Sequence, residues 1–349
     1  MDLHDAFDVP APAIVLAEGA FGTPQGKTAN GVVAHGELFD VQAVVDSTAA
    51  GDDAATVLGR DDETLAEIPV VDSVAEALDH APTAEALVLG VAPAGGQLPE
   101  AWVEDLETAM RAGCDVVSGL HTFLSEDDRW SAFADECGVR LFDVRKPPTG
   151  DDLRVADGSV DELDTPVVLT AGTDCAVGKR TTTFELYRAA QRAGIDAGWV
   201  ATGQTGVMVG ADRGVVVDRV PADFAAGVVE SMVCAVADDH DIVFVEGQGA
   251  LSHRAYGGVS LALLHGSWPD AVVLVDDPTR ERRDDFEQFA VPDVDSEAAL
   301  VESLSEATIV GISTWGDPDE ENYSYPAANV YDEGGPEALL DEVQSAVQL

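Results

Sequence analysis

Residues 167–182 read Val-Val-Leu-Thr-Ala-Gly-Thr-Asp-Cys-Ala-Val-Gly-Lys-Arg-Thr-Thr. An apolar run, a glycine loop and a polar stretch that suits a helix follow one another in this segment. The backbone N–H groups of such a loop face an anion, and the dipole of the following helix favours the negative charge. The segment therefore predicts a phosphate-binding loop on a parallel sheet. The residues expected at the ligand are Gly172, Thr173, Asp174, Cys175, Ala176, Val177, Gly178, Lys179, Arg180, Thr181 and Thr182.

This loop departs from the usual phosphate-binding loop in two ways. Five residues separate its two glycines, one more than the usual four. Arg180 follows Lys179 at the position where a serine or threonine normally supplies a Mg²⁺ ligand. Lys179 is placed to reach a terminal phosphate, whereas Thr181 or Thr182 would have to replace the missing hydroxyl. The sequence thus predicts anion binding and leaves the metal contact open.

A second motif supports the same site. Residues 241–249 read Asp-Ile-Val-Phe-Val-Glu-Gly-Gln-Gly, an apolar strand that ends in Glu246. At the carboxyl edge of a parallel sheet, Glu246 would face the glycine loop across the crevice. There it can act as a catalytic base or, if the ligand is a Mg²⁺-nucleotide, bind the metal together with Thr181. The loop and this strand are similar to those of dethiobiotin synthetase and its P-loop relatives, which bind nucleotide phosphates.

Polar side chains near these motifs are candidates for contacting a substrate. The turn Gly203-Gln204-Thr205-Gly206 follows the next predicted strand and places an amide and a hydroxyl over the same crevice. Arg254 is a candidate ligand for a substrate carboxylate. His253 and His265 are further candidates for a catalytic base, although a single histidine is more often structural.

The composition indicates a protein adapted to high salt. The chain has 66 acidic and 18 basic residues and a formal net charge of -48. Such a charge repels itself at low ionic strength and is screened within about 3 Å in 1 M salt. We therefore expect a cytoplasmic protein from a salt-loaded cytosol. Without a basic patch we expect no nucleic-acid partner, and without a long apolar run we expect no membrane span.

Apolar runs bounded by glycine, proline and aspartate recur in two series and predict two α/β domains. The first series lies at 13–17, 41–45, 86–91, 115–118 and 139–144, and the second at 166–171, 197–201, 242–245, 271–275 and 308–312. We predict two doubly wound parallel sheets, in a Rossmann-like domain (1–148) and a P-loop NTPase-like domain (149–349). The very acidic segment 276–305 is expected to be a surface excursion.

The first domain opens with a glycine loop of its own. Residues 18–28 read Glu-Gly-Ala-Phe-Gly-Thr-Pro-Gln-Gly-Lys-Thr and follow a predicted strand, and Asp46 ends the next strand. An acid at that place binds ribose in dinucleotide folds, but the usual GxGxxG fingerprint is absent. Lys27 and Thr28 are instead candidates for holding a substrate carboxylate or a phosphate. The loops 46–51, 92–96 and 118–121 are expected at the same edge of the sheet.

The motifs occur in a specific order: EGAFG, GKTANG, DSTAAG, GVAPAGG, SGLHTFLSED, DVRKPP, GTDCAVGK, ATGQTG, EGQGALSH and LLHGS. This order resembles the two-domain P-loop family long catalogued as a domain of unknown function, whose N-terminal half is Rossmann-like. The resemblance covers nearly the whole chain. Some members of that family act as D-glutamate N-acetyltransferases, which transfer acetyl from acetyl-CoA to the amine.

That resemblance implies a role for the loop without hydrolysis. Acetyl-CoA carries phosphates that Lys179 and Arg180 would bind as anions, so no Mg²⁺ need be activated. A base must then take a proton from the substrate ammonium group, and the candidates are Glu246, His253 and His265, in that order. We therefore expect an N-acyltransferase that acts on an acidic amino acid, with acetyl-CoA as its cofactor, and that forms a homo-oligomer.

Three alternatives remain open at this stage. The loop and Glu246 also suit an ATP-dependent carboxylate ligase or kinase of the dethiobiotin synthetase type, with ATP and Mg²⁺. A nucleotide-binding regulatory protein would use the same loop without turnover. The first domain alone suggests an NAD-dependent epimerase or dehydratase, for which Asp46 would be the ribose ligand.

Overall fold

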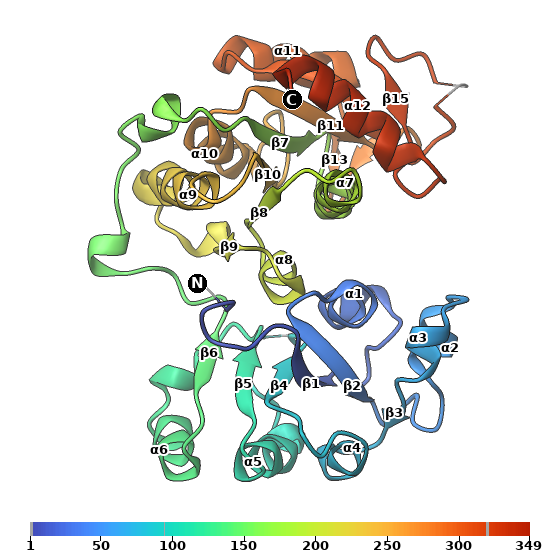
Figure 1. Cartoon of the computed structure of the whole chain (residues 1–349), viewed down its shortest axis with the longest axis vertical. Helices are drawn as coiled ribbons and strands as arrows, with labels where there is room; N and C mark the ends of the chain where they lie inside the picture. Colours follow the sequence, from blue (N-terminus) through green and yellow to red (C-terminus); the bar gives the residue numbers. More distant parts are fainter. Residues whose placement is uncertain (1–2, 94, 319–320) are drawn as a thin grey trace. The chain divides into compact units, whose positions relative to one another are not determined.

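The computed structural model describes residues 3–93, 95–318 and 321–349 (Figure 1). The chain divides into two compact units. The first comprises the residues up to Lys146 together with Gln204–Gly210, and the second comprises Pro147–Gly203 and Ala211–Leu349. Within the described ranges, every helix is too short or too polar to cross a membrane. One residue of the predicted loop 92–96, Ala94, lies outside the described residues.

The first unit is built on a six-stranded parallel sheet with the order β3-β2-β1-β4-β5-β6. This is the Rossmann order, in which the direction of winding reverses between β1 and β4. Its strands are β1 (Ala11–Leu16), β2 (Phe39–Val45), β3 (Val70–Val71), β4 (Ala86–Leu89), β5 (Asp115–Ser118) and β6 (Leu141–Asp143). Its helices are α1 (Lys27–His35), α2 (Ala54–Leu58), α3 (Glu63–Ala66), α4 (Val74–His80), α5 (Val103–Arg111), α6 (Asp128–Cys137) and α8 (Gln204–Val209).

Helix α8 belongs to the first unit although the chain reaches it from the second. The Thr205 hydroxyl lies 2.7 Å from that of Thr28 in α1, and both side chains are buried. The backbone N–H groups of Glu37 and Leu38 donate to the carbonyl of Val209. The turn that contains Gln204 and Thr205 is therefore packed on α1. The predicted boundary after residue 148 places these residues in the second domain, whereas the structure assigns Gln204–Gly210 to the first unit.

The second unit contains a seven-stranded parallel sheet with the order β15-β14-β11-β7-β10-β8-β9. Its strands are β7 (Val167–Gly172), β8 (Ala197–Ala201), β9 (Arg213–Gly214), β10 (Ile242–Glu246), β11 (Ala271–Asp276), β14 (Thr308–Thr314) and β15 (Ala327–Ala328). A separate antiparallel pair is formed by β12 (Arg282–Arg283) and β13 (Phe286–Ala290). The helices are α7 (Lys179–Arg192), α9 (Ala222–Ala237), α10 (Gly257–Ser267), α11 (Val294–Leu304) and α12 (Gly335–Val347).

Helices cover both faces of this second sheet. Helices α9 and α10 pack on each other on one face, whereas α7 and α12 pack together on the other (Figure 1). Every residue of β10 and β11 is buried, as a central parallel strand requires. The predicted fold class, two doubly wound parallel-sheet domains, is confirmed.

Candidate functional site

The predicted phosphate-binding loop lies between β7, which ends at Gly172, and α7, which begins at Lys179. Gly178 has a φ of +99°, a left-handed conformation that favours glycine. A Cβ atom at this position would also lie 2.9 Å from the indole nitrogen of Trp315. That nitrogen donates a 2.6 Å hydrogen bond to the carbonyl of Val177, so the half-exposed indole rests on the loop. The predicted strand, loop and helix are confirmed.

Lys179 is buried inside the loop. Its ammonium group donates to the backbone carbonyl of Asp174. Burial lowers the pKa of Lys179 to about 8, against the raising effect of the nearby Cys175, Asp174, Glu297 and Glu246. The ammonium is thus desolvated and held by the loop itself. It forms no ion pair with any described residue, so an arriving anion would provide a directly paired charge.

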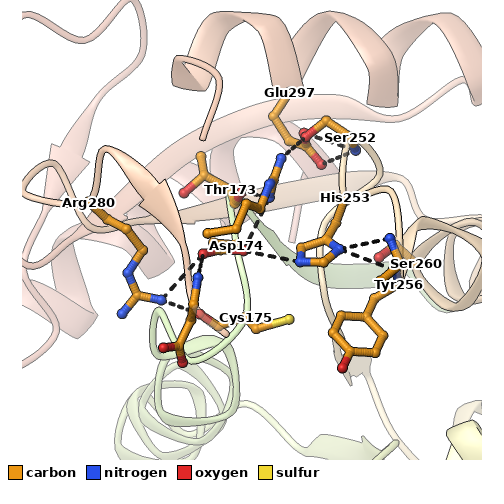
Figure 2. Close-up of polar contacts among 12 residues, drawn as sticks. Thr173, Asp174, Cys175, Ser252, His253, Tyr256, Ser260, Arg280 and Glu297 are labelled. Atoms are coloured by element: carbon orange, nitrogen blue, oxygen red, sulfur yellow. Dashed lines mark hydrogen bonds and ion pairs between the residues drawn. The ribbon is translucent and has the colours of Figure 1, made fainter. Parts of the chain in front are cut away.

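Asp174 is an anchor of the loop (Figure 2). Its carboxylate accepts hydrogen bonds from Arg283 at 3.2 Å and from the Asp284 N–H at 3.0 Å, and it lies 3.5 Å from Arg280. Burial raises the pKa of Asp174, but hydrogen bonds from the N–H groups of Asp284 and Cys175 and from Arg283 outweigh that effect and lower it. The carboxylate is ionised and is hydrogen-bonded to Arg283 and to the Asp284 N–H. These contacts attach the loop to the segment that contains β12.

The arginines behind the loop were missed by the sequence interpretation. Arg283 is buried and donates to the carbonyl of Thr173 at 2.7 Å, and Arg280 donates to the carbonyl of Cys175 at 2.6 Å. Glu297 in α11 is fully buried and accepts from the N–H groups of Leu251 and Ser252. The expectation that 276–305 is a surface excursion is therefore wrong. The run Arg280-Glu-Arg-Arg283 could have indicated a role for this segment, because three arginines in four residues are unusual in a chain with 18 basic residues.

Glu246 occupies the predicted position at the carboxyl end of β10. It is 4% exposed, and its two oxygens accept from the Thr202 N–H at 3.4 Å and from the Gln248 amide at 3.3 Å. Burial raises the pKa of Glu246 to about 7, although Arg180, the Thr202 N–H and Lys179 act to lower it. A carboxylate that exchanges its proton near neutral pH is suited to general-base catalysis.

His253 does not have the geometry expected of a base. Its Nδ1 accepts from the N–H groups of Ala255 and Tyr256, so the ring proton sits on Nε2. Nε2 is buried without a hydrogen-bond partner in the described structure and lies 3.8 Å from Asp174 (Figure 2). The lone pair on Nδ1 is therefore engaged by backbone N–H groups and Nε2 carries the proton, so neither nitrogen is free to accept a proton. For the same reason Nε2 cannot bind a metal beside Asp174 and Cys175, although the three side chains lie close together.

His265 is separated from the other candidates by the direction of its helix. Helix α10 begins at Gly257, after the carboxyl end of β10, and runs back toward the start of β11. His265 lies in the last turn of α10, where it is exposed and its ring is 6.1 Å from that of Trp268. His265 thus lies at the C-terminal end of α10, and its role as a catalytic base stays a prediction.

The hydroxyl groups at the start of α7 differ in their surroundings. Thr182 is buried and its hydroxyl lies 2.8 Å from that of Ser313 in β14. Thr181 is half-buried, as is Arg180. Of the two threonines considered as metal ligands, Thr182 is thus engaged in packing α7 against the sheet.

The predicted substrate-binding residues fall in different units. Lys27, Thr28, Gln204 and Thr205 lie in the first unit, where Lys27, Thr28 and Gln204 line one cavity. Arg254 lies in the second unit, exposed, with its guanidinium 4.7 Å from the centre of the Phe289 ring.

Asp46 is engaged by the first glycine loop itself. Its buried carboxylate accepts from the N–H groups of Gly19, Ala20 and Phe21 and from the N–H and hydroxyl of Thr48. These loop N–H groups are the ones that would bind a dinucleotide pyrophosphate in a Rossmann fold. The Asp46 carboxylate accepts from these N–H groups, so neither the N–H groups nor the carboxylate is available to a dinucleotide. This arrangement disfavours a nicotinamide site.

Comparisons with known proteins agree with this architecture. The domain of unknown function DUF1611_C, described as a P-loop domain, matches residues 154–339, and DUF1611_N, described as a Rossmann-like domain, matches residues 47–147. A crystal structure of a DUF1611 family protein from Anabaena variabilis ATCC 29413 superimposes with a TM-score of 0.83 and 33% identity, covering 96% of this chain and 99% of that one.

Two relatives have names that describe an activity. A D-glutamate N-acetyltransferase of Tritonibacter scottomollicae is 38% identical over 236 residues, 66% of this chain and 69% of that protein. One of Pseudoalteromonas sp is 36% identical over the same shares. These relatives support an enzyme of the acyltransferase type. The chain belongs to the DUF1611 family, with its Rossmann-like N-terminal domain and P-loop C-terminal domain.

Proposed function

We propose that this chain is an N-acyltransferase that transfers the acetyl group of acetyl-CoA to the amine of an acidic amino acid, with D-glutamate as the acceptor. The observation that carries the proposal is Glu246, a buried carboxyl group beside the P-loop whose pKa is raised to about 7. The names of two relatives at 38% and 36% identity support the same activity.

Two cations of the P-loop support acetyl-CoA as the cofactor, because its phosphates are anions. Lys179 is a buried cation whose contact is a neutral carbonyl, and Arg180 follows it where a hydroxyl would serve a metal. Two adjacent cations at a helix N-terminus suit an anion that is held rather than hydrolysed. Acetyl-CoA supplies an acyl group that is activated as a thioester.

The chemistry assigned to this chain is the handling of a proton. An amino acid carries an ammonium group at neutral pH, and an ammonium nitrogen has no lone pair with which to attack. Glu246 takes this proton on a carboxylate oxygen and so frees the amine. Its pKa near 7 keeps a large fraction of the group ionised at neutral pH while leaving it basic enough to accept the proton.

The test is turnover with a defined set of acceptors. Purified protein in 1 M KCl is incubated with acetyl-CoA and D-glutamate, L-glutamate or D-aspartate, and the free thiol of CoA is measured. The proposal expects CoA release that depends on an acidic amino acid and is fastest with D-glutamate. No release with any of the three acceptors would refute it. Release of ADP from Mg²⁺-ATP in the presence of the amino acid would instead identify a carboxylate ligase or kinase.

A further inference from the structure

The first unit contains a cavity of its own, lined by residues that the description of the P-loop does not include. It has an empty volume of about 470 Å³, open solvent included, and its lining includes residues at the carboxyl ends of β4 and β5 and at the start of α1. This is the edge of a Rossmann sheet at which the strand order reverses, between β1 and β4. Ligands of open α/β sheets bind at such a reversal.

The lining of the cavity is cationic in a strongly anionic chain. It includes the cations Lys27 and Arg145 together with His121, and no described aspartate or glutamate lines it, although acidic residues outnumber basic ones by 66 to 18 in the whole sequence. Arg145 is 9% exposed, and its Nε donates to the carbonyl of Gly119 at 2.8 Å, which fixes the guanidinium in the wall. Lys27 is exposed, and its ammonium group makes no hydrogen bond or ion pair within the described residues.

The start of α1 adds to the positive potential. Lys27 and Thr28 form the first turn of this nine-residue helix, which has no acidic residue in its first turn and no side-chain cap. The Ala29 N–H of this turn donates to the carbonyl of Gly90 at 3.0 Å, and no acidic side chain of the first turn offsets the positive end of the helix dipole. Gly90 at the end of β4 permits a close approach, because a Cβ atom there would lie 2.7 Å from that of Ala29.

Helix α8 completes the cavity with a neutral polar group. The contact between the hydroxyls of Thr28 and Thr205 ties α8 to α1, and the next residue toward the N-terminus, Gln204, lines the cavity. A cavity that offers two cations and an amide suits a small molecule with carboxylate oxygens. A dinucleotide is disfavoured, because Asp46 occupies the N–H groups of the neighbouring glycine loop.

We propose that this cavity in the first unit binds a small dicarboxylate through Lys27 and Arg145, with Gln204 as a further hydrogen-bonding group. The identification of this ligand with the acceptor amino acid rests on the proposed function. In that case Lys27 and Arg145 hold the carboxylates of D-glutamate and select acidic amino acids over neutral ones.

The experiment is titration calorimetry on the full chain in 1 M KCl with D-glutamate, glutarate and inorganic phosphate. Lys27→Gln is the test variant, because an exposed lysine can be replaced without disturbing the core. Lys146→Gln is the matched control, since Lys146 is also partly exposed but is paired with Ser125 and Glu126. Arg145→Lys tests the second cation while retaining its charge.

We expect D-glutamate and glutarate to bind the wild-type chain, with a dissociation constant at least tenfold higher in Lys27→Gln and unchanged in Lys146→Gln. Arg145→Lys is expected to weaken binding as well, because lysine cannot reproduce the two-pronged contact. Equal affinity in the wild type and Lys27→Gln, or binding of phosphate without either dicarboxylate, would overturn the proposal.

Turnover measurements separate this inference from the proposed function. Binding that depends on Lys27 but is accompanied by no CoA release supports the site and refutes the acyltransferase. CoA release with the same KM for D-glutamate in Lys27→Gln and wild type supports the acyltransferase and refutes the site.

Discussion

Replacement of Glu246 by glutamine is expected to slow turnover strongly and at the same time to stabilise the folded chain at alkaline pH. Glutamine keeps the shape of the side chain and its contacts with Thr202 and Gln248 but cannot accept a proton. General-base catalysis typically contributes a factor of about 10² to 10⁴, so the rate of CoA release should fall by roughly that factor.

The stability effect follows from the direction of the pKa shift. Burial raises the pKa of Glu246 from 4.5 to about 7, so the folded state binds this proton more tightly than the unfolded state. The resulting stabilisation is present below pH 4.5 and is lost as the pH rises through about 7. At about 1.4 kcal/mol per pKa unit, the free energy of unfolding of the wild type decreases by about 3 kcal/mol over this range. The glutamine variant has no ionisable group at this position, so its stability does not decrease for this reason.

Two assays in 1 M KCl check this prediction. Urea titrations at pH 5 and pH 8 give the free energies of unfolding, and the advantage of Glu246→Gln over wild type should grow between the two. The rate of CoA release by the wild type should rise through about pH 7, as Glu246 ionises. Glu230→Gln is the control, because Glu230 is a buried glutamate in α9 that accepts from the N–H groups of Asp157 and Gly158. It should be destabilised at pH 8 and remain active.

A Glu246→Gln variant that retains the wild-type rate and pH dependence would refute the assignment of the base. A difference in unfolding free energy that is the same at pH 5 and pH 8 would refute the raised pKa. The two readouts are independent, since the first requires substrates and the second does not.

Three further predictions concern charge. Arg180→Gln should raise the pKa of Glu246 further, because Arg180 acts to lower it, so the rise of the rate with pH should move to higher pH, whereas Arg180→Lys should restore it. Asp46→Asn should lower the unfolding free energy in urea by about 3 kcal/mol, since charged hydrogen bonds to the first glycine loop are lost, and CoA binding measured by calorimetry should not change. With a net charge of -48, the melting temperature should rise between 0.1 M and 2 M KCl, and an unchanged value would contradict the screening argument.

The sequence predicted the sheets and the P-loop because these depend on local patterns. Buried parallel strands are apolar throughout, and β10 and β11 lie close to the predicted apolar runs. This criterion missed the two-residue strands β3, β9, β12 and β15, and also β13, most of which is exposed. The position of Glu246 followed from the rule that strand ends gather at one edge of the sheet.

Contacts between distant segments could not be predicted in this way. Arg283 and Asp174 are separated by 109 positions, and no local pattern connects them. Helix α8 follows a strand of the second unit, and only its packing on α1 assigns it to the first. Asp46 shows a different limit, because an acid at a strand end has the same sequence signature whether it binds a ribose or the backbone of its own loop.

We propose above that the P-loop unit serves acyl transfer to an amine without nucleotide hydrolysis. The most direct measurement supplies acetyl-CoA with a labelled acetyl group and D-glutamate in 1 M KCl, without ATP, and determines the product by mass spectrometry. We expect one labelled N-acetyl group on D-glutamate for each CoA released, and a large decrease of both products in Glu246→Gln. Formation of the product only when Mg²⁺-ATP is added, with ADP in equal amount, would contradict it.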